Sequence, residues 1–435
     1  MPKQTESPKS RRKWRVRIVS FMCTAGIIVF GAPYVGIHFA EQALTRRDAN
    51  AAITWLDWAA IWGSQKGRIE FLRARSLRRL GSLDGFRLAL TTAAEHGYSK
   101  EALDREQVLL MAQMGQLRHV EHRIGTILRT VADDAAEVCE AYTNGLLVNL
   151  RQTEALNVVD HWAKDYPHDA QPEVVRGLIL KSINRVKRAE DAFRKAVALD
   201  ADSVDARREL GAILLDSRRL DEALVIFERF KEDSELRDFA LLQISKCHRQ
   251  RGDLTAAEQA LAALSERPSL PAGDIALQYG LLCLDRQRFE EAMKYLTEAL
   301  AAQPRAIEAQ HATAQALRGL GRFEEAAIQS QLVAEAETEL SRIGSLHDQV
   351  VAHPSATEPR LEIAKIELRY GNPHRGLVCL KGVLNIQPDH LETLETLAEY
   401  YEASKETNDE LAVLADEYRK RAATLQQPHV DDATE

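Results

Sequence analysis

The sequence predicts an all-α protein: a superhelix of about ten stacked helix pairs, preceded by a single N-terminal transmembrane helix. Three observations support this fold class. Alanine and leucine dominate the hydrophobic 45% of the 435 residues, whereas aromatic residues make up only 6%, a mixture that favours helices over strands. The first 40 residues are basic and then apolar. Much of the remaining chain repeats a helical pattern at a nearly fixed interval.

The N-terminal segment carries the membrane prediction. Residues 1–17 have a net charge of +6, and residues 18–40 contain no Asp, Glu, Lys or Arg. About 20 apolar residues are enough for a helix to cross a bilayer, and basic residues beside a span stay in the cytoplasm. We therefore predict a basic cytoplasmic tail at 1–17 and a transmembrane helix at 18–40. The repeats would then lie on the outer, periplasmic side.

Two other interpretations of this segment are open. A cleaved signal peptide has the same order of a basic and then an apolar part. The apolar run is long for a signal peptide, however, and no clear small-x-small cleavage site follows it. A helix buried in a protein core is the other interpretation, and the seven Lys and Arg residues before the apolar run disfavour it.

A small residue recurs along the chain at intervals of 34 or 35 residues. It stands at Ala155, Ala189, Ala223, Ala257, Ala292 and Ala326. Each interval contains two segments with apolar residues at helical spacing, such as 204–216 and 220–231, joined by a short turn. Prolines such as Pro304 follow the second segment, where they end a helix. The pattern predicts an array of helix pairs.

The repeat resembles that of the tetratricopeptide repeat family. The pattern of that family has small residues at positions 8 and 20, a large residue at 24, Ala at 27 and Pro at 32 of about 34 residues. One unit fills all five positions with Gly280, Ala292, Leu296, Ala299 and Pro304. The resemblance implies a superhelix in which the small residues let paired helices approach closely. It also implies that the first helix of each pair lines a concave groove.

The phase of the repeat divides the chain into segments. The core array is predicted at 136–340, and further units are predicted at 357–424. Between them, 341–356 is an inserted helical segment. Residues 41–135 fit the pattern only as degenerate helical repeats, and the acidic, aperiodic end at 425–435 is predicted to be disordered.

The sequence contains no pattern that is typical of a catalytic site. It has no GxxxxGK[ST] loop, no GxSxG elbow and no HExxH metal motif, and its five cysteines form no CxxC pair. We therefore predict that the protein is not an enzyme and has no catalytic residues, no cofactor and no metal. Beyond residue 17 the net charge is −14, which argues against general nucleic-acid binding because that requires a basic face.

The resemblance also implies which side chains line the groove. Positions 2, 5, 9 and 12 of the units give the candidate binding residues Arg208, Phe239, Leu242, Lys246, Arg249, Leu277, Leu281, Leu284, His311 and Gln315. The middle of this set is apolar and one side is cationic. Such a groove suits an extended or helical peptide with apolar anchors and some acidic groups. Alternatively, the leucines pack on neighbouring helices.

These observations together predict a membrane-anchored scaffold that binds proteins or peptides through its groove. Anchoring would use residues 18–40. The resemblance implies a role in envelope assembly, secretion or quality control. Two alternatives are a receptor or assembly factor that faces the cytoplasm, and a regulatory subunit of a membrane enzyme such as a glycosyltransferase.

Overall fold

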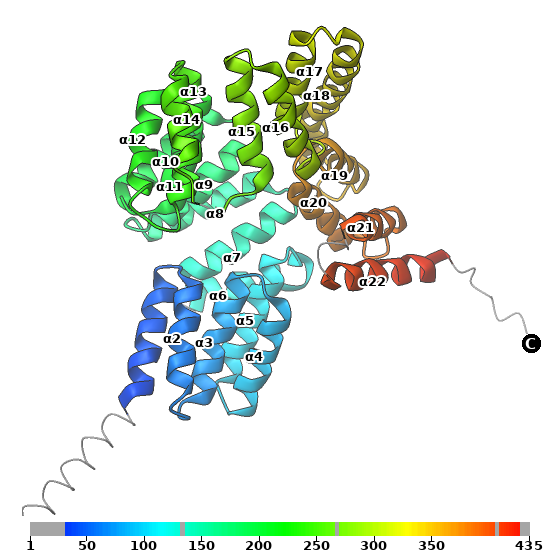
Figure 1. Cartoon of the computed structure of the whole chain (residues 1–435). Coiled ribbons are helices and arrows are strands. Elements are labelled where there is room, and N and C mark those ends of the chain that lie inside the picture. The colour runs from blue at the N-terminus through cyan, green and yellow to red at the C-terminus, as the bar shows by residue number, and fades with distance from the viewer. Residues whose placement is uncertain (1–30, 131–134, 266–268, 405–408, 427–435) are drawn as a thin grey trace, which may run out of the picture. The chain divides into compact units, whose positions relative to one another are not determined.

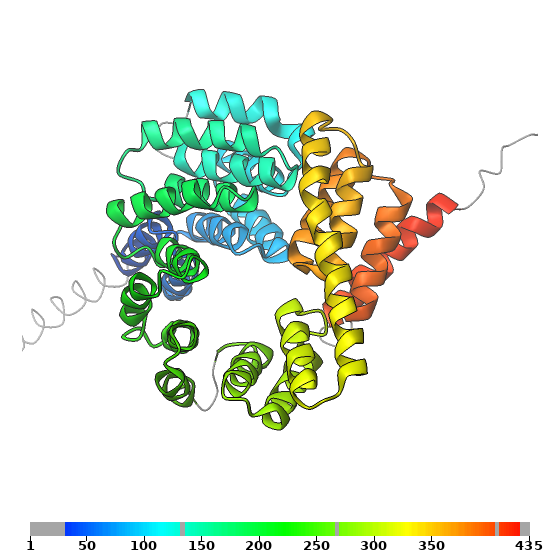
Figure 2. The same cartoon turned by 90° about the horizontal axis from the view of Figure 1, so that it is seen from above.

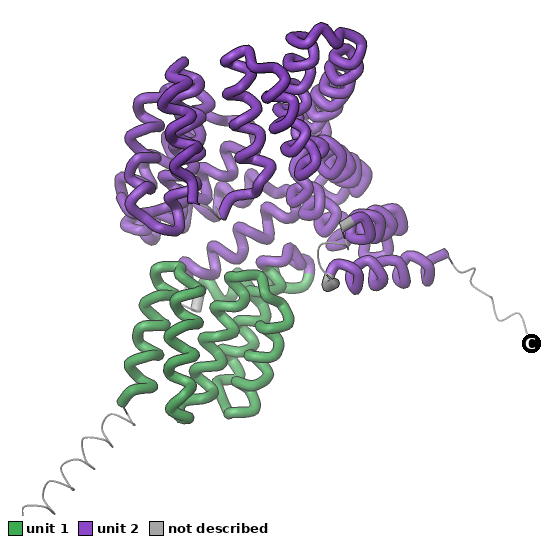
Figure 3. The backbone as a smooth tube through the Cα atoms, viewed as in Figure 1, with its two compact units in different colours: residues 1–112, 119–132 green, residues 113–118, 133–435 purple. Residues whose placement is uncertain are grey.

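The computed structural model describes residues 31–130, 135–265, 269–404 and 409–426, and the secondary structure of these residues is helical throughout (Figure 1). The chain divides into two units (Figure 3). Unit 1 comprises residues 1–112 and 119–132, and unit 2 comprises residues 113–118 and 133–435. Each unit is a series of antiparallel helices with its own buried core. The all-α repeat solenoid that the sequence predicts is therefore present.

The first helix in the described part of unit 1 covers residues 31–45. It is followed by α2 (Ala49–Ala60), α3 (Lys66–Arg79), α4 (Leu83–Glu95), α5 (Lys100–Gln113) and α6 (Leu117–Thr130). The core of this unit contains Phe71, Leu72 and Phe86, and the Phe71 ring stacks on Tyr98 with 4.4 Å between ring centroids. Arg78 and Glu106 form an ion pair of 2.9 Å that is buried on both sides.

The predicted transmembrane helix at 18–40 is wrong. Residues 18–30 lie outside the described part of the chain, whereas Ile37, Ala40 and Leu44 are buried in one core with Ala52 and Leu56 of α2. None of the helices within the described residues is both long and apolar enough to cross a bilayer. The predicted fold class and the predicted single-pass localisation are corrected accordingly. Residues 31–45 instead form a helix that packs in a protein core, which is the interpretation that the preceding Lys and Arg residues disfavoured.

Unit 2 is built from successive helix pairs. Its helices are α7 (Ala135–Val148), α8 (Gln152–Asp165), α9 (Gln171–Ser182), α10 (Val186–Leu199), α11 (Val204–Asp216), α12 (Leu220–Phe230), α13 (Arg237–Arg251), α14 (Leu254–Ala262), α15 (Ala272–Asp285), α16 (Phe289–Ala302), α17 (Ile307–Gly319), α18 (Phe323–Ala352), α19 (Glu358–Tyr370), α20 (Pro373–Ile386), α21 (Leu391–Ser404) and α22 (Asp409–Gln426). From α9 onward, each odd-numbered helix is the first of a pair and packs on the next helix in the chain.

Small residues set the distance between the helices of a pair. A Cβ atom on Gly177 of α9 would lie 2.6 Å from ring carbons of Phe193 on α10, which is closer than real Cβ contacts. A Cβ atom on Gly280 of α15 would likewise lie 2.8 Å from Cδ2 of Leu296 on α16. Glycine is required at both positions because the partner helix lies against its backbone.

Helix α18 is about twice as long as its neighbours, with 30 residues. Its second half contains most of the segment 341–356, which the sequence sets apart as an insertion. Leu346 and Val350 in this half pack in one core with Leu361 and Ile363 of α19. The next helix pair therefore packs on the far end of α18 and not beside α17.

Unit 2 completes a superhelical turn in which α20 packs against α7 (Figure 2). The buried Arg360 Nη1 donates a hydrogen bond of 2.7 Å to the carbonyl oxygen of Asn149, which lies 211 residues earlier in the chain. Arg118, at the start of α6 but within unit 2, donates a hydrogen bond of 2.8 Å from Nη1 to the carbonyl oxygen of Ile386. A Cβ atom on Gly382 would lie 2.7 Å from the carbonyl oxygen of Val148. Each end of the turn thus contributes an arginine side chain that binds a backbone carbonyl of the other end.

Candidate functional site

The first helices lie on the inner side of the array in its central part. Helix α13 approaches α15, and α15 approaches α17, more closely than the second helices of these pairs approach one another. A stack of pairs curves toward the side on which its elements are closest together. The candidate binding residues on α13, α15 and α17 therefore belong to the concave side, which is the side where solenoid proteins commonly bind their ligands.

The leucines among the candidate binding residues are packed inside the array. Leu277 and Leu281 of α15 are 9% and 8% exposed, and they share one core with Ala309, Ala312 and Ala316 of α17. These three alanines lie on the face of α17 that packs on α15. Leu284 is partly buried against the same core. These leucines therefore pack on neighbouring helices, as the alternative interpretation of them supposed.

The two remaining apolar candidates are also packed in the core. Leu242 of α13 lies in a cluster with Leu282 of α15, and it is almost completely buried. The Phe239 ring is inclined by 77° to that of Phe227, with 6.1 Å between ring centroids, and it is partly buried against the core of the preceding pairs. The apolar middle of the predicted groove is therefore interior surface between stacked pairs.

The cationic candidates take part in a series of charge contacts along the first helices. Arg249 Nη1 lies 3.2 Å from Asp285 Oδ2 of the next first helix, and Arg208 Nη2 lies 3.2 Å from Asp205 Oδ1 of its own helix. Lys246 lies near Asp216 of the preceding first helix. Burial raises the pKa of Asp216, and the positive charge of Lys246 opposes that rise. This side of the array is polar and carries both signs of charge.

The last two candidates, His311 and Gln315, lie on an exposed face. Together with Arg318 they stand 34 residues after Leu277, Leu281 and Leu284, at the same positions of the next unit. We name the surface formed by His311, Gln315 and Arg318 of α17 with Ser330 and Glu337 of α18 the α17–α18 face.

Two contacts order the α17–α18 face. His311 Nε2 lies 3.1 Å from Glu337 Oε1, and Arg318 Nη2 donates a hydrogen bond of 2.7 Å to Ser330 Oγ. On α15 the corresponding surface is covered by α17, whereas here the side chains of the three α17 residues are exposed. The reason is the length of α18, which displaces α19 to the region around Leu346. The structure thus brings His311 and Gln315 together with three polar residues outside the predicted set.

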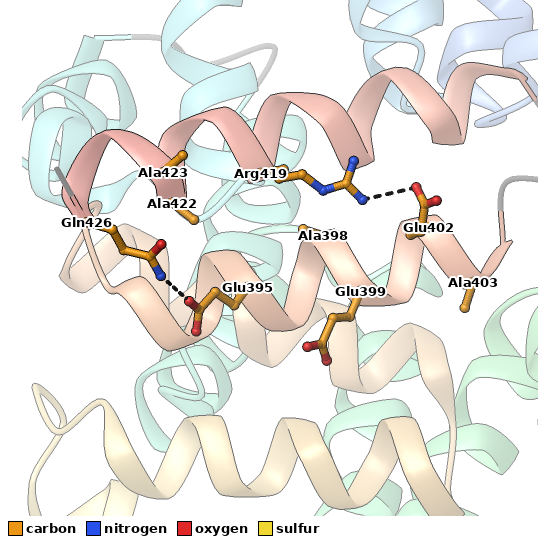
Figure 4. A pocket seen from close by; sticks show the side chains of 9 residues that line it. All are labelled: Glu395, Ala398, Glu399, Glu402, Ala403, Arg419, Ala422, Ala423 and Gln426. Atoms are coloured by element: carbon orange, nitrogen blue, oxygen red, sulfur yellow. Dashed lines mark hydrogen bonds and ion pairs between the residues drawn. The ribbon is translucent and has the colours of Figure 1, made fainter.

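A second concave site lies between α21 and α22 and has a volume of about 510 Å³ (Figure 4). It is lined by Glu395, Ala398, Glu399, Glu402, Ala403, Arg419, Ala422, Ala423 and Gln426. Gln426 Nε2 donates a hydrogen bond of 2.7 Å to Glu395 Oε1, and Arg419 Nη2 lies 3.2 Å from Glu402 Oε2. The candidate set stopped at Gln315 and missed this groove. Continuing positions 5, 9 and 12 into the final unit would have found its three glutamates.

Within residues 31–130, 135–265, 269–404 and 409–426, no three His, Cys, Asp or Glu side chains are arranged to hold a metal ion. Burial raises the pKa of Cys139 and Cys247 to about 11 and that of Cys379 to about 12. These thiols stay protonated near neutral pH and pack as small apolar groups.

The stacked pairs and their exposed inner face define a helical-repeat protein of the α-solenoid class. The tetratricopeptide repeat model matches residues 175–235, 242–307 and 277–340. The family model thus matches this central part of the chain, where the spacing of the small residues predicts repeats of that kind.

Solved structures with a similar arrangement share little sequence with the chain. A tetratricopeptide repeat protein from Parabacteroides merdae ATCC 43184 is 13% identical, over 66% of this chain and 99% of that one, with a TM-score of 0.34. Residues 41 to the end of MamA from Desulfovibrio magneticus RS-1 are 19% identical, over 48% and 98%, with a TM-score of 0.28. The human IFIT1 dimer with PPP-AAAA is 16% identical, over 83% and 91%, with a TM-score of 0.39. No curated protein matches the chain. At these scores the likenesses carry no argument about function.

Proposed function

We propose that the protein is a non-enzymatic scaffold that binds a segment of another protein on the α17–α18 face. The observation that carries this proposal is the exposure of His311, Gln315 and Arg318 at positions that one unit earlier are two buried leucines and one partly buried leucine. An array that continued regularly would cover these positions with the next first helix. Here they are polar and accessible on the concave side.

The chemistry of this face suits an extended polypeptide. The exposed Gln315 amide carries both a donor and an acceptor, and so it can bond a backbone N–H and a backbone C=O. Only one of the guanidinium N–H groups of Arg318 donates to Ser330 Oγ in the described contacts, so other donors of this group are available. A guanidinium is well suited to binding a carboxylate. The partner we propose is therefore a peptide segment with an acidic residue, recognised by backbone and side-chain hydrogen bonds. Assembly, secretion or quality control of other proteins would each use this activity.

A site-specific photo-crosslinker tests the proposal in cells that express the full chain. We expect a crosslinker at Gln315 to capture a discrete protein that mass spectrometry identifies by a peptide containing Asp or Glu. A crosslinker at Glu335, which is exposed on α18 outside the α17–α18 face, is the matched control. Adding Arg318→Glu should remove the captured band and leave helicity unchanged. Equal capture at both positions, or capture that survives Arg318→Glu, would refute the proposed site.

A further inference from the structure

The groove between α21 and α22 has the register of a surface that elsewhere receives a helix. Its residues Glu395, Ala398, Glu399 and Glu402 stand 118 residues after Leu277, Gly280, Leu281 and Leu284 of α15, one for one. On α15 the leucines of this stripe share a core with alanines of α17, whereas Gly280 lies against Leu296 of α16. Since the three positions that are leucines on α15 also line the α21–α22 groove, the register of the groove is that of a surface on which an α-helix packs.

Both walls of the groove have helical periodicity. The α21 residues follow the spacing i, i+3, i+4, i+7 and i+8, and Arg419, Ala422, Ala423 and Gln426 of α22 follow i, i+3, i+4 and i+7. Ala398 and Ala422 lie between the two helices and form the floor, and their small side chains let a third helix approach closely (Figure 4). The groove extends over about two turns.

The charge of the groove determines what kind of helix can occupy it. Where α15 presents leucines, α21 presents three carboxylates, and Arg419 is the only cation among the nine lining residues. The carboxylates of Glu395 and Glu402 already accept contacts from Gln426 and Arg419, whereas Glu399 is exposed at the centre of the stripe. A second copy that presented the same face would place like charges opposite each other, which is unfavourable.

We propose that this groove binds an α-helix of a partner protein, with small side chains facing the alanine floor and Lys or Arg facing Glu399. The helix would occupy the place that α17 has on α15. Its cations would pair with the row of glutamates and set its direction and register. This surface and its occupant are separate from the α17–α18 face and its peptide.

Fluorescence anisotropy with labelled peptides and the full chain tests the proposal. The basic probe is a peptide of residues 237–251 with Cys247→Ala, which has the sequence of a first helix and a net charge of +3. The neutral probe is a peptide of residues 307–319, which has the sequence of α17 and no net charge. We expect the basic probe to bind and the neutral probe to bind about tenfold more weakly or not at all.

Two variants locate the binding in the groove. Glu399→Lys should weaken binding of the basic probe by about tenfold, whereas Glu335→Lys on the exposed side of α18 makes the same change in net charge and should leave binding unchanged. Ala423→Trp fills the groove without a change in charge and should also abolish binding. Circular dichroism should show native helicity for all three variants.

Each other outcome overturns the proposal. Binding that survives Ala423→Trp but falls equally with both charge reversals would be diffuse electrostatic attraction. Failure of the basic probe to bind the unaltered chain would mean that the polar groove only solvates the end of the described array. Self-association in light scattering that Glu399→Lys abolishes would identify a second copy as the occupant.

Discussion

Substitution of Gly177 by Ala tests the packing on which the repeat depends. Gly177 is buried in the middle of α9, and a Cβ atom there would lie 2.6 Å from two ring carbons of Phe193. Phe193 is itself completely buried, so the ring cannot move into solvent. The added methyl group therefore has to displace either the ring or the two helix backbones.

The expected magnitude follows from two opposing contributions. Alanine is favoured over glycine inside a helix by about 0.8–1 kcal/mol. Overpacking a buried site costs about 1–3 kcal/mol. We therefore expect Gly177→Ala to lower the free energy of unfolding of unit 2 by about 1 kcal/mol. Gly344 in α18 is the matched control because a Cβ atom there meets no atom within 4 Å. Gly344→Ala should instead stabilise the protein by up to about 1 kcal/mol.

The Phe193→Ala background makes the test specific for this contact. That substitution alone should cost about 3–5 kcal/mol, and it removes the ring that the new methyl group strikes. Gly177→Ala should then become stabilising, by up to about 1 kcal/mol, because only the helix propensity remains. The assay is urea unfolding by circular dichroism, with native-state hydrogen exchange of residues 171–199 to report local opening in a repeat array. An equal cost of Gly177→Ala in both backgrounds would refute the reasoning.

Three further predictions concern charges in unit 2. Burial lowers the pKa of His347 in the folded protein. As pH falls from 7.5 to 5.5, the unfolded chain therefore binds a proton at this histidine before the folded chain does, and the free energy of unfolding should fall. The urea midpoint of His347→Gln should change less over the same pH range. Arg360→Met leaves the carbonyl of Asn149 without its donor; unfolding free energy should fall by about 1–3 kcal/mol, with faster hydrogen exchange around residue 149, and unchanged exchange would contradict this. Arg249→Ala removes the partly exposed pair with Asp285 and should change thermal stability by less than about 1 kcal/mol.

The architecture could be predicted from the sequence because its constraints are local. The small residue at a helix crossing and the large residue beside it belong to the same unit, as Gly177 and Phe193 show. Each pair must satisfy this contact whatever follows it. Because every unit meets the same requirement, the same residue types recur at a fixed spacing, and this spacing can be recognised in the sequence without a structure.

The interpretation of residues 31–40 failed because hydropathy does not distinguish between kinds of apolar surroundings. Ile37 and Ala40 pack in one core with α2, whereas Tyr34 on the same helix is exposed and Phe39, which stacks on Trp55 of α2, is 40% exposed. A stretch without charges suits a bilayer and a protein core equally well on composition alone. The difference lies in α2, whose Ala52 and Leu56 supply the complementary face.

The candidate groove could be predicted only in part because exposure at its positions depends on the next pair. Leu277 and Leu281 satisfy the positional rule, yet α17 covers them. His311 and Gln315 satisfy the same rule and are exposed because α18 continues for 30 residues and carries α19 away. The position within a repeat therefore predicts which way a side chain points. It does not predict whether another helix lies there.

Residue type at these positions supplies the missing information. The same stripe is leucine on α15, where a helix covers it, and His311, Gln315 and Arg318 on α17, where α19 packs elsewhere. An exposed leucine stripe would invite non-specific association, and a covered polar stripe would bury groups without hydrogen-bond partners. Stability thus selects leucine under a helix and polar residues in the open. By the same reasoning, the three glutamates of α21 indicate that no leucine-lined helix contact forms there. A partner at that groove must bring the opposite charge with it, which is the property that the basic probe supplies.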